Sequence, residues 1–193
     1  MLAIIIFAFS IMYSPGPANM LALFAGINHQ GWRALLYCVG VGCAMFILFL
    51  VFGYLGSNLI PSHYQRLIAV LGGLYIAYLA IKVLLASRAE QKSPAGATQL
   101  TFKTGLILQL CNPKSLVAII PITTVQFANA DITGSAILAW SLLLSIMSCG
   151  APSLYLFAGS RLKKAALNPF VMAWLNRIMG ALLLYVAYGF IFH

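Results

Sequence analysis

The stretch Ser14-Pro15-Gly16-Pro17-Ala18-Asn19 interrupts an apolar run that covers residues 1–27. Each of its two prolines removes a backbone N–H donor and displaces the carbonyl four residues earlier, on Ile11 and on Tyr13. In a lipid bilayer, an interrupted helix is tolerated only where its backbone is buried in protein or lines a cavity. The stretch is therefore either a packing kink or part of a binding site.

The composition excludes a soluble globular domain. Of the 193 residues, 63% are hydrophobic and only 7% are charged, and the mean hydropathy is +1.00. Soluble domains carry about 25% charged residues. We therefore expect an all-α polytopic membrane protein with one membrane domain over residues 1–193. So little mass remains outside the membrane that a separate catalytic or nucleotide-binding domain has no room, and we expect no enzymatic activity. We also expect no cofactor, no metal and no nucleic-acid partner.

Six apolar segments have lengths near the ~20 residues that a helix needs to cross a bilayer. They cover residues 2–27, 34–56, 65–87, 105–128, 134–158 and 170–192. The segment 88–104 is the longest polar connection and divides the chain into a first part, 1–87, and a second part, 105–193. Each part is predicted to contain three helices.

The basic residues predict that both termini lie on the outer side of the membrane. With that orientation, the loop 88–104 is cytoplasmic and Asp131 is periplasmic. The basic residues that then fall in cytoplasmic loops are Arg33, Arg88, Lys92, Lys103, Arg161, Lys163 and Lys164.

The two parts resemble repeats. The third helix of the first part carries Leu-Tyr-Ile-Ala-Tyr at 74–78, and the third helix of the second carries Leu-Tyr-Val-Ala-Tyr at 184–188. Three helices per part require the two repeats to be inverted relative to each other. Inverted repeats are typical of secondary transporters, whose binding sites lie near the membrane midplane.

The second repeat also has an interrupted first helix, at Gln109-Leu110-Cys111-Asn112-Pro113-Lys114-Ser115. Lys114 lies about nine residues into the segment 105–128, ~14 Å along the helix axis. A lysine at that depth costs about 2.5–3.5 kcal/mol. It is tolerable beside a polar cavity, and the alternative is a kink with a lysine that snorkels to the interface.

Two broken helices can form a receptor for a zwitterion. We expect free N–H groups on residues 18–21 and 114–117 to attract a carboxylate. We expect the carbonyls of Ile11, Tyr13 and Gln109 to lack partners and to accept from an ammonium group. Lys114 adds a positive charge and is a candidate proton carrier, because the predicted helices contain no carboxylate. The candidate substrate-binding residues are Ser14, Pro15, Gly16, Pro17, Asn19, Gln109, Asn112, Pro113, Lys114 and Ser115.

With Ser-Pro-Gly-Pro-Ala-Asn-Met-Leu-Ala-Leu at 14–23 and Leu-Gln-Leu-Cys-Asn-Pro-Lys at 108–114, the chain resembles the LysE/RhtB family of amino-acid exporters. It looks most like the cysteine/O-acetylserine branch, although Ala18 stands where many members of that branch have asparagine. The resemblance implies export of small neutral amino acids or derivatives, cysteine/O-acetylserine-like or homoserine/threonine-like. It also implies a location in the bacterial inner membrane and a proton gradient as the driving force. The sequence leaves open whether the protein forms a homodimer.

Two other functions are alternatives. A membrane thiol–disulfide electron carrier would need one reactive cysteine beside each break. Cys111 meets this requirement, but Tyr13 and Ser14 occupy the corresponding position at the first break. A divalent-metal exporter would need oxygen- or imidazole-rich helices, and the predicted helices carry no acid or histidine at midplane depth.

Overall fold

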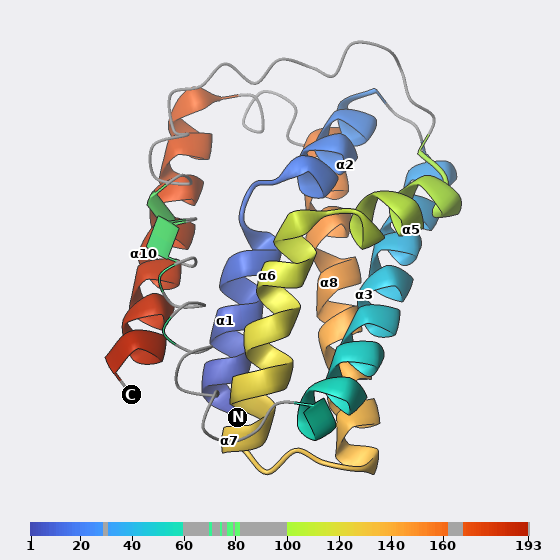
Figure 1. Ribbon diagram of the computed structural model, residues 1–193. Helices are drawn as coiled ribbons and strands as arrows, with labels where there is room; N and C mark the ends of the chain where they lie inside the picture. Colours follow the sequence, from blue (N-terminus) through green and yellow to red (C-terminus); the bar gives the residue numbers. More distant parts are fainter. Residues whose placement is uncertain are drawn as a thin grey trace.

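The structure is a computed structural model that describes residues 1–28, 31–59, 70, 74, 77–78, 80–81, 100–161 and 168–192. The regular secondary structure of this part of the chain is all helical, without strands, which confirms the all-α prediction (Figure 1). The helices are α1 (Leu2–Tyr13), α2 (Pro17–Ile27), α3 (Trp32–Leu59), α5 (Phe102–Leu110), α6 (Pro113–Pro121), α7 (Phe127–Asn129), α8 (Ser135–Arg161) and α10 (Pro169–Phe192). A π-helical turn, η2 (Ile122–Gln126), joins α6 to α7.

Two of these helices are long and apolar enough to cross a membrane alone, over residues 33–55 and 135–161. Two bent pairs meet the same criteria together, so the described residues form two spans, or up to four if each pair is one span. The pair α1–α2 bends by 56°, and the pair formed by residues 102–110 and 114–129 bends by 65°. The predicted segment 65–87 lies largely outside the described residues, so the total of six spans stays a prediction.

Both bends occur where the sequence predicts them, and local chemistry explains each. Proline at the first position of a helix loses no intrahelical hydrogen bond, and Pro17 and Pro113 begin α2 and α6 in this way. The preceding residues, Gly16 and Asn112, have extended backbone conformations that turn the chain away from the helix before them. Each break therefore ends one half-helix and starts another.

The helix α5 begins earlier than predicted, at Phe102 instead of about residue 105. The reason is a capping box, in which the side chains of Thr101 and Thr104 each accept a hydrogen bond from the other residue's backbone N–H. The predicted loop 88–104 therefore ends inside a helix, and its residues 88–99 lie outside the described part of the chain.

Glycines bring two pairs of helices into backbone contact. A Cβ atom on Gly26 of α2 would overlap the backbone of α8, and one on Gly159 of α8 would overlap the backbone of α2. Gly40 of α3 and Gly105 of α5 form the same reciprocal arrangement. Small residues at such crossings let membrane helices approach closely. The half-helix α2 is thereby fixed against α8, and the half-helix α5 against α3 (Figure 1).

The remaining half-helices pack elsewhere. In Figure 1, α1 lies between α10 and α6, and contacts with both helices agree with this placement. The apolar core around α1 includes Phe7, Ile119 and Ile122, all fully buried. Large apolar side chains of α8 such as Ile146 and Phe157 remain exposed, which suits a surface that faces lipid.

The second copy of the sequence repeat, at 184–188, lies on α10, where Leu184, Tyr185 and Tyr188 are exposed. The first copy, at 74–78, falls partly outside the described residues. The inverted relation between the two repeats therefore stays a prediction.

Candidate substrate site between two broken helices

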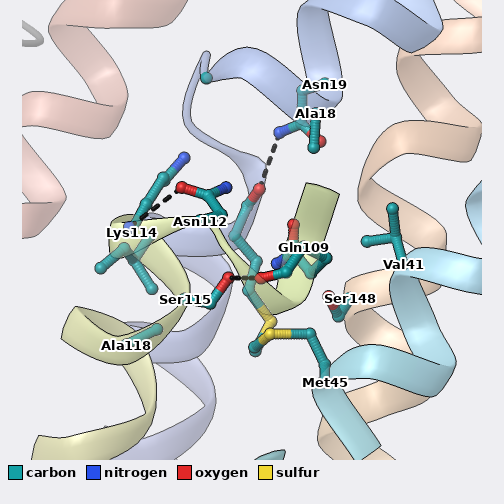
Figure 2. Close-up of a pocket in the computed structure, with 13 residues that line it drawn as sticks. Ala18, Asn19, Val41, Met45, Gln109, Asn112, Lys114, Ser115, Ala118 and Ser148 are labelled. Atoms are coloured by element: carbon teal, nitrogen blue, oxygen red, sulfur yellow. Dashed lines mark hydrogen bonds between the residues drawn. The ribbon is translucent and has the colours of Figure 1, made fainter. Parts of the chain in front are cut away.

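A small cavity of about 30 Å³ lies between the two breaks, and it is half open, so that the empty space including its mouth is about 390 Å³. Figure 2 shows side chains from α2, α3, α5, α6 and α8 converging on it. Its lining residues are Ile11, Met12, Gly16, Ala18, Asn19, Val41, Met45, Gln109, Asn112, Lys114, Ser115, Ala118 and Ser148. Both predicted broken stretches therefore border the same space.

The carbonyls freed by the first break have partners, so the prediction that they are unpaired is wrong for Ile11 and Tyr13. The Ser14 hydroxyl donates to the Ile11 carbonyl at 2.9 Å. The Tyr155 hydroxyl, from α8, donates to the Tyr13 carbonyl at 3.0 Å. Burying a carbonyl without a partner costs free energy comparable to a lost hydrogen bond, and these two side chains remove that cost.

Asn19 holds the first break from its other side. Its amide nitrogen donates to the Met12 carbonyl at 2.8 Å and to the Ser14 carbonyl at 3.0 Å. Asn19 is only 4% exposed, so its amide links the start of α2 to the end of α1 inside the protein (Figure 2). This asparagine stabilises the shape of the break as well as lining the cavity.

The second break is held by equivalent contacts. The Asn112 side chain accepts from the Lys114 backbone N–H at 3.0 Å, and the Ser115 hydroxyl donates to the Gln109 carbonyl at 2.8 Å (Figure 2). The Gln109 carbonyl is therefore not free for a substrate, contrary to the sequence prediction. Backbone N–H groups at both half-helix starts are also engaged, since Ser115 donates to Asn112 and Met20 donates to Gly16. The prediction of fully free N–H groups is wrong for Met20, Lys114 and Ser115.

Lys114 connects the two breaks directly. Its ammonium group donates to the Ser14 carbonyl at 2.9 Å. A Cβ atom on Gly16 would lie 3.1 Å from the same ammonium nitrogen, so the absence of a side chain at Gly16 leaves room for this contact. Among the described residues that line the cavity, Lys114 is the charged one.

Gln109 carries an unpaired acceptor. It lines the cavity and is 8% exposed, and its side-chain oxygen Oε1 is buried without a hydrogen-bond partner in the described structure. A buried amide oxygen without a partner costs about 1–3 kcal/mol. Such an atom beside a cavity is a position at which a ligand donor can bind.

Some of the ten predicted site residues line the cavity and others do not. Six line the cavity: Gly16, Asn19, Gln109, Asn112, Lys114 and Ser115. Ser14 does not line it but supplies the carbonyl that Lys114 contacts. Pro15 and Pro17 are outside the lining, and Pro113 contributes the first position of α6.

Several cavity residues were not predicted from the sequence. Val41 and Met45 come from α3, and Ser148 comes from α8. In the sequence they are ordinary residues of apolar segments, without a break or a charge to mark them. Only their spacing of four, for Val41 and Met45, indicates that these two share one face of a helix.

The cysteines bear on the thiol–disulfide alternative. All four are free; Cys111 is exposed, whereas Cys38 is buried. Cys111 is also absent from the cavity lining.

In the described part of the chain, no three histidine, cysteine or acidic side chains are grouped so that they could hold a metal ion.

Two interrupted apolar helices that border one polar cavity are the arrangement found in secondary transporters, and the class defined here is that of a membrane transport protein. Residues 9–193 match the family described as LysE type translocator, and the chain belongs to this family. It is similar to the leucine efflux protein of Enterobacter sp. (strain 638), with 27% identity over 162 residues, 79% of this chain and 76% of that protein. No solved structure matches the chain. The family indicated by the two motifs is confirmed, whereas the cysteine/O-acetylserine branch stays a prediction.

Proposed function

We propose that this protein is a secondary transporter that exports neutral α-amino acids across the bacterial inner membrane. The family and the apolar helices support a membrane translocator. The similarity to a leucine efflux protein supports amino-acid export as the activity. The proposed site is the cavity between the two breaks.

The observation that carries the proposal is the pairing of Lys114 with Gln109 in one cavity. Lys114 supplies a cationic donor, and the Gln109 Oε1 atom supplies an unpaired acceptor. An α-amino acid has a carboxylate for the first group and an ammonium for the second. Each charge-assisted hydrogen bond is stronger than one between neutral groups.

The cavity also favours a substrate without net charge. Its described lining has the cationic Lys114 and no acidic side chain. One carboxylate of a zwitterion balances this charge. A second cationic group on the substrate would have no counter-charge, and a second carboxylate would compete for the same lysine.

The proposed topology has six spans in two inverted repeats, with the N-terminus, Asp131 and the C-terminus in the periplasm. The basic residues of the predicted cytoplasmic loops support it. Reporter fusions test it directly. A reporter that works only in the cytoplasm should be active when fused at residue 95, and a reporter that works only in the periplasm should be active when fused at the C-terminus. The opposite result at either position would contradict the topology.

We propose that export is coupled to the proton gradient, with Lys114 as the group that carries the proton. The described parts of the spans contain no carboxylate, and Lys114 is the cation at the cavity. A variant that binds substrate but no longer responds to a pH gradient identifies the carrier, and Lys114→Arg is the suitable one because arginine does not release its proton.

The test of function is transport by the full chain reconstituted in lipid vesicles. Vesicles that contain the protein and are loaded with one radiolabelled amino acid should exchange it with external neutral amino acids. Loaded vesicles without the protein should not. Gln109→Met should weaken exchange about tenfold, which corresponds to ~1.4 kcal/mol of binding.

The matched control is Gln126→Met. The Gln126 Oε1 atom is also buried without a partner, but Gln126 does not line the cavity. Exchange equal to the parent in Gln109→Met, or equal losses in both variants, would contradict the proposed site.

A further inference from the structure

The cavity has a second, apolar side. Ile11, Met12, Val41, Met45 and Ala118 line it, and we call these five residues the apolar wall. All five are between 1% and 8% exposed. In Figure 2, Met45 and Ala118 lie below Gln109, away from the labelled Asn19 of α2, and Val41 lies to the right of Gln109. The polar groups of the two breaks therefore face only part of the space.

We propose that the apolar wall is the subsite for the substrate side chain and that it selects aliphatic amino acids of leucine or methionine size over homoserine and O-acetylserine. The inference rests on the proposed function and adds the residues that determine specificity. It departs from the cysteine/O-acetylserine preference that the motif resemblance implies.

The position of the wall relative to Lys114 supports this assignment. Lys114 and Ala118 are four residues apart on α6, so they share one face of the helix. Four residues correspond to about 6 Å along the helix axis. Ala118 is therefore within reach of the side chain of a substrate whose carboxylate binds Lys114.

The chemistry of the wall supports an aliphatic side chain. Transfer of apolar groups out of water is favourable, whereas a polar side chain loses its hydrogen bonds to water at such a surface. Met12 and Met45 contribute flexible thioethers, which adapt to apolar shapes. A single methylene changes discrimination by about 10–200-fold in a hydrophobic pocket.

One residue offers the opposite chemistry. The hydroxyl of Ser148 belongs to a cavity-lining residue that is 3% exposed. A substrate hydroxyl or ester could pair with it. Five apolar residues line the cavity beside this hydroxyl, which favours the aliphatic assignment, and substitution of Ser148 distinguishes an aliphatic from a hydroxyl-bearing substrate.

The experiment is exchange by the full chain in lipid vesicles, with unlabelled competitors against radiolabelled leucine. Leucine and methionine should compete at concentrations at least tenfold lower than homoserine or O-acetylserine. Ala118→Leu fills the space and should shift the preference toward alanine. Ala118→Ser adds a hydroxyl with little bulk, so it should narrow the difference between the competing concentrations of leucine and homoserine. This variant tests the proposal even if Ala118→Leu fails to fold.

Two further variants complete the design. Met45→Ala should weaken leucine binding about tenfold, whereas Met147→Ala should leave it unchanged, because Met147 packs in the core without lining the cavity. Ser148→Ala should not reverse the preference for leucine over homoserine. If the parent exchanges amino acids but prefers homoserine, and Ser148→Ala removes that preference, the apolar subsite is wrong and the proposed function stands. If no amino acid is exchanged, the proposed function itself fails.

Discussion

The ammonium group of Lys114 donates a hydrogen bond to the carbonyl of Ser14 at 2.9 Å, across 100 positions of the sequence. The carbonyl belongs to the first break and the lysine to the second. A single contact therefore ties together the two interrupted helices, at the edge of the cavity that both of them line.

Replacing Lys114 with methionine should reduce transport at least tenfold, because the proposed carboxylate anchor is lost. Membrane insertion should not suffer, since a costly charge is removed from the span. Exchange in vesicles, normalised to inserted protein, measures the effect. Lys103→Met is the control, because Lys103 is exposed on α5 and does not line the cavity. A methionine variant that transports like the parent would mean that Lys114 has only a structural contact.

The double variant Pro15→Ala/Pro17→Ala should insert normally and lose transport. Alanine is a much better helix former than proline, so α1 and α2 should tend to join into one helix and close the cavity edge. Exchange measurements report transport, and the protein yield in membranes reports insertion. Normal exchange by this variant would show that the break is a packing kink.

Tyr155→Phe should destabilise the protein by about 1 kcal/mol, the net contribution of a typical hydrogen bond. The substitution leaves the Tyr13 carbonyl without the donor that holds it at 3.0 Å. For a chain of this length, we expect the melting temperature in detergent to fall by about 2–4 °C. Tyr185→Phe should not change it, because Tyr185 is exposed on α10. Equal melting temperatures for the two variants would contradict a structural role of the Tyr155 hydroxyl.

Gly159→Val should separate α2 from α8 and reduce the amount of folded protein severalfold. Any Cβ atom at this position overlaps backbone atoms of α2, which cannot move aside as a side chain would. Size-exclusion profiles of extracted protein report the loss. Ala139→Val is the control, since Ala139 is exposed on the same helix. Wild-type yield of Gly159→Val would show that the two helices are not tightly joined.

The sequence predicts the two breaks well because proline acts locally. Pro17 and Pro113 fix the helix starts through their own geometry, without help from distant residues. The charge of Lys114 also indicates a cavity in advance, because a lysine at that depth in a span needs polar surroundings.

The partners of the freed carbonyls could not be predicted, because they come from distant helices. Tyr155 lies 142 positions from Tyr13, and no local pattern connects them. Val41 and Met45 look like any lipid-facing pair in an apolar segment. Which face of α3 points inward depends on the glycine contacts between α3 and α5, and these become visible only in three dimensions.

The main-chain crossings at Gly26 and Gly159, and at Gly40 and Gly105, separate two kinds of position in the protein. Because backbone atoms make these joints, the frame of the bundle does not depend on which large side chains line its interior. Residues such as Met45 and Ala118 can therefore change during evolution without loosening the joints. A scaffold of this kind can acquire a new cargo by a few interior substitutions while its architecture stays the same.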